Sequence, residues 1–378
     1  MRDKFEADRL LTARAVRSAA NQMFLQAQTW GLPRWRLDMS RMAVAADLTA
    51  ETVRANYPDL NVPFHARWRH FTAGDRNLWD EAEKPSDPME LGRAAFDLVI
   101  PSVLLDAGAG PDWRYRDATG TELSRSEGLG VASLRMWEAG ALDDLSGVTA
   151  ASIAEAFQVS PGNPLVGVEG RAALLRQLGS TIGHPRKLFD LVAARAKGGR
   201  IDAEDILELL LSELGPIWPG RLTRGGRPLG DCWPHPVSPT ELVPLHKLSQ
   251  WMTYSLIEPL QWAGIEVVRI DGLTGLAEYR NGGLFVDTGV LVLRDPDDQR
   301  QAHPVGSPLV VGWRSLTVAL LDRLAPMVRE RLGVSAKAFP LARMLEGGTW
   351  AAGRKIARQL RPDEGGPPIA IMSDGTVF

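Results

Sequence analysis

The sequence predicts a mainly α-helical, multi-helical protein with a few short strands. Apolar residues recur at helical spacing over long stretches, most clearly in residues 202–214, 245–263 and 308–332. Stretches with the alternating pattern of a half-buried strand are few and short. The 26 prolines and 37 glycines indicate many turns between the helices.

The first elements are expected to be two helices. Residues 4–30 carry apolar side chains near helical spacing, and Gly31-Leu-Pro33 ends the pattern. Thr49 suits the N-cap of a second helix. That helix should stop before Pro58, because a residue that precedes proline avoids the helical conformation.

The later elements alternate with turns. A short helix is expected at 171–178, and residues 215–244 are rich in Pro and Gly, which predicts a long ordered loop or a connection between lobes. In the helix 245–263, Pro259 should produce a kink or an end near Ser255. The tail is expected to form two short strands around an Asp374-Gly375 turn.

The length of 378 residues is sufficient to bury a large core. We expect residues 1–378 to form one compact unit, with two helical lobes as the open alternative. The lobes would be 1–180 and 181–378, the second of which carries the Lys247 and Glu278 motifs described below.

The composition excludes several classes of protein. A net charge of −3 argues against general nucleic-acid binding, which needs an excess of Lys and Arg. No apolar run reaches the roughly 18 residues of a membrane span. The single cysteine, Cys232, rules out an internal disulfide framework and fits a reducing compartment. The acidic, polar N-terminus does not resemble a signal peptide, so a cytoplasmic location is expected.

The most informative segment runs from Leu273 to Asp287. Glu278, Tyr279 and Arg280 place a carboxylate, a phenol and a guanidinium side by side, ahead of two glycines that allow close approach of the backbone. The run from Gly282 onward could open a helix whose free N–H groups face the same spot. We interpret this segment as the floor of a small-molecule site. The alternative is a helix-entry loop that contains a buried Glu–Arg ion pair.

A second candidate lies at the start of the helix 245–263. His246 and Lys247 stand in its first turn, where the partial positive charge of a helix N-terminus disfavours basic residues. An anion bound there, most simply a phosphate held by free N–H groups and Lys247, would relieve this conflict. The alternative is a Lys247 side chain that turns outward to water. Trp251 and Tyr254, with Tyr279, are candidates to pack on a sugar or a leaving group.

Residues 64–71 form a dense basic-aromatic cluster. His65, Arg67, Arg69 and His70 could supply further anion donors, or the arginines could stack on aromatic rings and pair with acids of another helix.

Three further patterns match known motifs only in part. The run Val103–Gly110 resembles the first motif of S-adenosylmethionine-dependent methyltransferases, but Pro111 and its successors are a poor start for the helix that such a motif needs; a tight turn is the other interpretation. Cys232, His235 and His246 are metal ligands by type but lack a recognised fourth ligand, so no metal and no cofactor is expected. No Gly-x-Ser-x-Gly elbow suggests Ser-His-Asp catalysis.

Six segments form a set of motifs spread along nearly the whole chain: Phe64–Phe71, Asp106–Gly110, Gly230–Trp233, His246–Trp251, Leu273–Gly283 and Gly347–Trp350. Together they resemble the uracil-catabolism protein four family of bacteria and fungi. The resemblance implies a place in pyrimidine degradation, alongside a uracil phosphoribosyltransferase and a GTP-cyclohydrolase-like protein.

A more distant similarity is to the queuosine-salvage glycosylase family. Lys247-Leu-Ser-Gln250, followed by Ala277-Glu278-Tyr279-Arg280, is similar to that family's Lys-Arg-Ala-Gln and Ala-Asp-Tyr-Arg. The similarity implies an all-α fold related to helix-hairpin-helix DNA glycosylases, and hydrolysis of the N-glycosidic bond of a ribonucleoside 5′-monophosphate. Lys247 would then hold the phosphate, and Glu278 would replace the catalytic aspartate. This chain departs from that family in the longer Glu and in Gly-Gly where the family has proline.

We therefore expect a metal-free hydrolase that cleaves a phosphorylated ribosyl derivative, for example a ureido-riboside phosphate, with pathway enzymes as its protein partners. A carboxylate can stabilise the sugar cation that develops in such a reaction or activate water. Glu278 and Arg280 are the catalytic candidates. An S-adenosylmethionine-binding enzyme and a non-catalytic scaffold protein are the alternatives. Asp106, Asp231, Glu258 and Asp287 are available by type as proton donors. The candidates for substrate binding are Lys247, Trp251, Tyr254, Tyr279, Asp287, His65, Arg67, Arg69 and Asp106.

Overall fold

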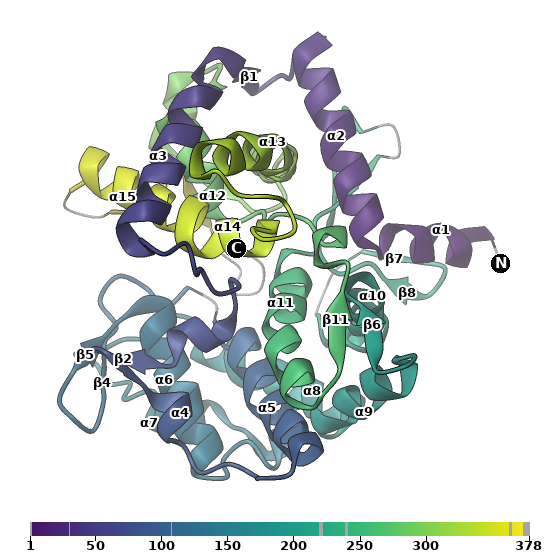
Figure 1. Cartoon of the computed structure of the whole chain (residues 1–378), viewed down its shortest axis with the longest axis vertical. Helices are drawn as coiled ribbons and strands as arrows, with labels where there is room; N and C mark the ends of the chain where they lie inside the picture. Colours follow the sequence, from purple (N-terminus) through teal and green to yellow (C-terminus); the bar gives the residue numbers. More distant parts are fainter. Residues whose placement is uncertain are drawn as a thin grey trace. The chain divides into compact units, whose positions relative to one another are not determined.

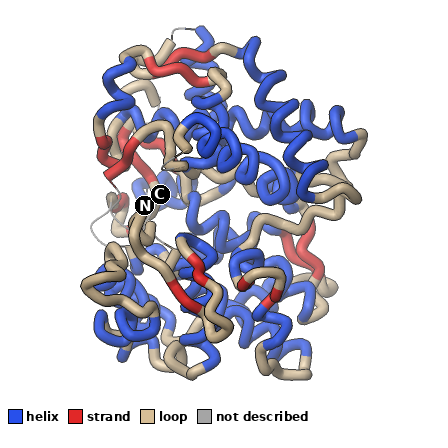
Figure 2. Tube along the Cα trace, turned by 90° about the vertical axis from the view of Figure 1, so that its left-hand side faces the viewer, coloured by secondary structure: helices blue, strands red, loops and turns tan. Residues whose placement is uncertain are grey.

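The structure, a computed structural model, is mainly helical, with strands confined to short pairs (Figure 2). It describes residues 2–29, 31–106, 108–218, 222–238, 241–362 and 365–372. The predicted fold class, mainly α with a few short strands, is confirmed. In the described part of the chain, no helix is long and apolar enough to cross a membrane.

The chain folds into two compact units, each assembled from separate stretches of sequence. The described residues of the first unit come from Met1–His65, Leu222–Gln250 and Ile270–Asp374. Those of the second unit come from Ala66–Arg221 and Trp251–Arg269. These segments differ from the lobes 1–180 and 181–378 suggested by the sequence, whose boundary falls within helix α8 of the second unit.

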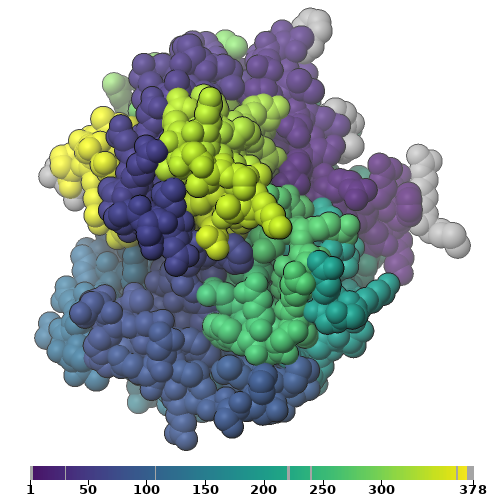
Figure 3. Space-filling model, viewed as in Figure 1, coloured from purple at the N-terminus to yellow at the C-terminus, as the bar shows by residue number. Residues whose placement is uncertain are grey.

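Helix α13 is the central element of the first unit. It is buried along most of its length because its apolar residues surround the whole helix, and it packs against α2, α3 and α12 (Figure 1). Ser307 caps its N-terminus and Gly333 ends it in a left-handed conformation. On the face in Figure 3, purple N-terminal helices flank the yellow-green part of this unit. The helices are α1 Arg2–Leu10, α2 Ala13–Thr29, α3 Met42–Asn56, α12 Tyr279–Asp287, α13 Pro308–Leu332, α14 Leu341–Met344, a π-helix Leu345–Trp350 and α15 Ala351–Leu360, and α11 Lys247–Trp262 begins here.

The described strands of the first unit form two-stranded pairs at its loops. Three pairs are antiparallel, and the pair β13–β14 is parallel. The pairs are β1 Trp35–Leu37 with β12 Leu291–Leu293, β7 Thr223–Arg224 with β8 Arg227–Pro228, β9 Cys232–Pro234 with β10 Leu242–Pro244, and β13 Ala302–Pro304 with β14 Ala370–Met372.

Helix α5 has the corresponding central place in the second unit. It packs against α6, α8 and α9, and all its residues from Ala94 to Leu104 are buried. The helices are α4 Leu78–Glu81, α5 Pro88–Leu104, α6 Arg125–Glu138, α7 Ala150–Ala156, α8 Val168–Ile182, α9 Arg186–Arg195 and α10 Ala203–Glu213. The strand pairs are β2 Thr72–Ala73 with β3 Arg76–Asn77, β4 Tyr115–Arg116 with β5 Glu122–Leu123, and the parallel β6 Arg200–Asp202 with β11 Glu266–Val268.

The helices predicted at 202–214, 245–263 and 308–332 are confirmed as α10, α11 and α13, and 171–178 lies within α8. The single helix predicted at 4–30 is wrong. The chain breaks between α1 and α2, where the hydroxyl of Thr12 accepts the N–H of Ala15 at 3.0 Å and so starts a new helix.

Two predicted helix starts are wrong, and the predicted hairpin of the tail is only partly described. Thr49 does not cap α3 but lies inside it, and its hydroxyl donates to the carbonyl of Ala45 at 2.7 Å. Helix α12 opens at Tyr279, ahead of the predicted start at Gly282. In the tail, β14 pairs with β13. The Asp374-Gly375 turn lies outside the described residues.

Pro259 does not end helix α11, which continues to Trp262. Proline lacks the N–H that would bind the carbonyl of Ser255. The indole N–H of Trp68 donates to that carbonyl instead, at 2.7 Å. Since the Ser255 carbonyl, which lacks its usual N–H partner in the helix, gains this other donor, the helix tolerates the proline.

Candidate functional site

Glu278 is the N-cap of helix α12 in the first unit. Its two carboxylate oxygens accept the backbone N–H groups of Arg280 at 2.9 Å and Asn281 at 2.5 Å. A side-chain acceptor at this position satisfies N–H groups that have no partner within the helix. The carboxylate is therefore held in one orientation. Glu278 is only 7% exposed.

Arg280 does not pair with Glu278, although both side chains are described. Its guanidinium lies over the rings of Trp350 and Tyr279, with the carbon atom 4.7 and 5.0 Å from the ring centroids. Arg280 is 7% exposed. The predicted helix-entry loop is thus present, but the buried Glu–Arg ion pair of the alternative interpretation is absent among the described contacts.

The other wall of this cluster is the π-helix Leu345–Trp350, which contains the Gly-Gly-Thr-Trp motif. One-turn π segments are often found at functional sites. Glu346 from this segment contacts Nδ1 of His65 at 2.6 Å, and the ring of His65 lies 5.9 Å from that of Trp350. A carboxylate, an imidazole and an aromatic ring thereby join Arg280 in one cluster. We call these residues, together with Glu278 and Tyr279, the Arg280 cluster.

Gly353 allows helix α15 to approach this cluster at backbone contact. A Cβ at Gly353 would lie 2.2 Å from the carbonyl oxygen of Arg280. We expect Gly353→Ala to lower the free energy of unfolding by roughly 1–3 kcal/mol or more, because one helix backbone must move. Urea denaturation would measure this effect. Gly170→Ala is the matched control: Gly170 lies in α8, and a Cβ added there would meet open space, so its replacement should be neutral or stabilising. Equal stability of the Gly353→Ala protein and the parent would contradict the contact.

The start of helix α11 already has an anion. The carboxylate of Asp231 accepts the backbone N–H of Lys247 at 3.0 Å, which is the position where the sequence predicts a phosphate. His246 precedes it in a left-handed conformation, with φ of 46°, and its Nε2 lies 2.9 Å from the carbonyl oxygen of Leu10. Burial lowers the pKa of His246 and favours its neutral form. The side chain of Lys247 is half-buried.

Arg314 of α13 connects the two motifs. It binds both oxygens of Asp231, at 2.9 and 2.8 Å, and also donates to the carbonyl of Ala277 at 3.2 Å. Ala277 directly precedes Glu278. The first turn of α11 and the cap of α12 are therefore held by one buried ion pair.

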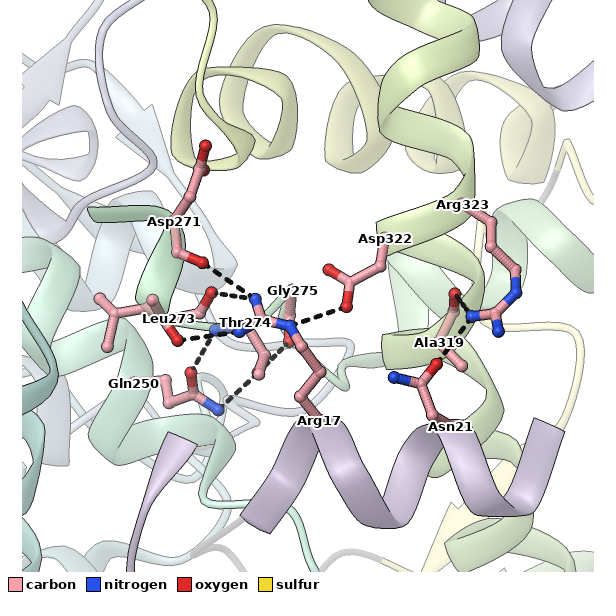
Figure 4. A network of polar contacts seen from close by, with 11 residues as sticks. Arg17, Asn21, Gln250, Asp271, Leu273, Thr274, Gly275, Ala319, Asp322 and Arg323 are labelled. Atoms are coloured by element: carbon pink, nitrogen blue, oxygen red, sulfur yellow. Dashed lines mark hydrogen bonds and ion pairs between the residues drawn. The ribbon is translucent and has the colours of Figure 1, made fainter. Parts of the chain in front are cut away.

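The loop that leads to Glu278 has two further anchors (Figure 4). The amide of Gln250 donates to the hydroxyl of Thr274 at 2.6 Å and accepts its N–H at 2.7 Å. Arg17 of α2 donates to the carbonyls of residues 271–273 and to Asp322. The Lys247–Gln250 and Leu273–Gly283 motifs, predicted to act together, thus share direct contacts. Arg314, Arg17 and Glu346 were missed, because no spacing in the sequence links them to these motifs.

Arg67 and Asp106 form a separate buried cluster in the second unit. Arg67 donates to the carboxylate of Asp106 and to the hydroxyl of Ser102, both at 2.7 Å. It also lies 5.8 Å from the ring centroid of Trp251. Burial lowers the pKa of the Arg67 guanidinium. This arrangement is close to the interpretation in which an arginine of the basic-aromatic cluster stacks on an aromatic ring and pairs with an acid: Arg67 lies 6.0 Å from the ring centroid of Phe71, and Asp106 follows the end of α5.

The remaining predicted residues also have structural partners. Arg69 pairs with Glu258 at 2.6 Å, and Tyr254 is completely buried in the second unit. In the first unit, Asp287 binds Arg361 through both oxygens, at 2.9 and 2.6 Å. The sequence-based group of binding candidates is therefore divided between the two units, and only His65, Glu278, Tyr279 and Arg280 belong to the Arg280 cluster.

The methyltransferase-type motif lacks its structural context. The residues before Asp106 form helix α5 instead of a strand, and β4 instead of a helix is the first regular element after Gly110. Ala107 lies outside the described residues. In the described part of the chain, no three His, Cys, Asp or Glu side chains are grouped so that they could hold a metal ion.

The fold and the site define a multi-helical protein with a buried arginine beside a carboxylate that caps a helix. The chain belongs to the family described as protein of unknown function (DUF1688), whose model matches residues 9–378.

Two curated relatives extend along nearly the whole chain. This chain is 39% identical to Protein urg3 of Schizosaccharomyces pombe, with 98% of each chain covered. It is 35% identical to Uracil catabolism protein 4 of Lachancea kluyveri, with 91% of this chain and 92% of that protein covered. The resemblance to the uracil-catabolism protein four family is thereby confirmed.

Proposed function

We propose that this protein acts in uracil degradation and hydrolyses the N-glycosidic bond of a phosphorylated ribosyl derivative. The substrate would be a ureido-riboside phosphate, which with water gives urea and ribose 5-phosphate. The name of the Lachancea relative supports the pathway. The observation that carries the reaction is the carboxylate of Glu278, which two backbone N–H groups hold in place next to Arg280 in the sequence.

This geometry suits a reaction through a sugar cation. Each oxygen of Glu278 accepts one N–H group and keeps a second lone pair, so the carboxylate can still face a ligand. A carboxylate fixed before the reaction stabilises developing positive charge without having to reorganise. It can alternatively orient the attacking water. The bond between C1′ and the urea nitrogen breaks, the nitrogen gains a proton, and water supplies the new hydroxyl.

A product assay tests this proposal. We expect the purified full-length protein to release urea and ribose 5-phosphate from ribosylurea 5-phosphate in equal amounts, followed by a urease-coupled assay and by NMR. The unphosphorylated ribosylurea should react far more slowly, because binding energy from the phosphate positions the reacting carbon. Absence of both products, with a folded protein, would rule out the reaction. If uracil were released from UMP faster than urea from ribosylurea 5-phosphate, the leaving group would be the intact base instead of urea.

A further inference from the structure

Arg280 differs from the other buried arginines of this protein. Four arginines are buried among the described residues: Arg67, Arg171, Arg280 and Arg314. Arg67 and Arg314 each pair with an aspartate, and Arg171 donates to backbone carbonyls. For Arg280, the described contacts include neither an ion pair nor a hydrogen bond from the guanidinium, only the two aromatic rings.

Burying a guanidinium without a counter-ion has a desolvation cost that the described contacts do not offset. Removing a charge from water costs more free energy than contact with a ring face returns. The nearest carboxylate in the sequence, Glu278, binds N–H groups of its own helix and makes no described contact with this guanidinium. Among the described residues no carboxylate neutralises Arg280, so its charge is available to an anionic ligand.

The shape of the guanidinium also determines which kind of ligand it can bind. The five N–H donors of a planar guanidinium lie in its plane, so contact with a ring face does not use them. Such an edge binds a carboxylate or a phosphate through two parallel hydrogen bonds. The phosphate is the only anionic group of the ureido-riboside phosphate proposed above.

We propose that Arg280 is the phosphate-binding residue of this protein. The identity of the ligand in this proposal rests on the proposed function. Arg280 is then a binding residue instead of a catalytic one. It takes the role that the similarity to queuosine-salvage glycosylases gave to Lys247. At the start of α11 the place for an anion is occupied by Asp231.

Calorimetric titration with ribose 5-phosphate tests the assignment in the full-length protein. We expect Arg280→Met to weaken binding by roughly 10- to 100-fold, the equivalent of one or two charge-assisted hydrogen bonds. Two controls should bind within about twofold of the parent protein. Arg323→Met removes an arginine that also lies over a ring, that of Phe24, but is held by Asn21 and Ala319 (Figure 4). Lys247→Met removes the competing cation.

Thermal stability separates this role from a structural one. Because Arg280→Met removes a buried charge that has no counter-ion among the described residues, the melting temperature without ligand should be unchanged or higher. Ribose 5-phosphate should raise the melting temperature of the parent and not of the variant. Parent-like affinity in Arg280→Met, or loss of binding in Lys247→Met alone, would overturn the assignment. Arg280-dependent binding in a protein that hydrolyses no ribosyl ureide would uphold it while the proposed function fails.

Discussion

Replacing Asp231 by alanine should lower the free energy of unfolding by about 3–5 kcal/mol. The change removes the acceptor of the Lys247 N–H and leaves Arg314 buried without its counter-ion. The side chain of Arg314 is completely buried, so water cannot replace the lost partner. Since Arg314 also holds the carbonyl before Glu278, both helix starts should loosen. Urea unfolding, followed by circular dichroism, measures the loss.

The controls are the single variant Arg314→Met and the double variant Asp231→Ala with Arg314→Met. The double variant removes both charges, so much of the lost stability should return, although the cap of α11 stays lost. Losses that simply add in the double variant would show that the two side chains do not stabilise each other.

The sequence predicted the helices well where a long apolar pattern coincides with burial. Residues 308–332 form α13 and residues 202–214 form α10 because these patterns have no competing signal. The run 4–30 continues in pattern across the break at Thr12, although in α1 Ala7 is buried whereas Phe5 is 65% exposed. Periodicity cannot show such a break, because a hydroxyl that caps a helix does not disturb the apolar spacing.

The candidate site could be predicted only in part. Adjacent polar residues marked Glu278 and Arg280, and the helix start marked Lys247. The contacts that join them are long-range: Arg314 and Asp231 are 83 positions apart, and His65 and Glu346 are 281 apart. No local pattern encodes such pairs. The sequence did show two basic residues at a helix N-terminus, an unfavourable placement. In the structure the carboxylate of Asp231 supplies the negative charge at this helix start.

Two variants of Glu278 distinguish a carboxylate that only caps a helix from one that also acts on substrate. Glu278→Gln keeps one oxygen for the N–H groups and loses the charge. We expect it to lower kcat by about 100- to 1,000-fold. The free energy of unfolding should fall by about 0.5–2 kcal/mol, and ribose 5-phosphate should still bind through Arg280.

Glu278→Asp completes the test, because aspartate is a good N-cap and keeps the charge while the carboxylate retreats by about 1.5 Å, one carbon–carbon bond. We expect near-parent stability and a turnover at least tenfold lower, since a misplaced group loses catalytic power steeply. Turnover and unfolding of both variants are measured on the same preparations. If Glu278 served the helix alone, kcat would follow stability, and the glutamine variant would hydrolyse substrate at the parent rate wherever it is folded. A carboxylate that acts on the sugar cation separates the two quantities, because the helix needs an acceptor whereas the reaction needs a charge at one position.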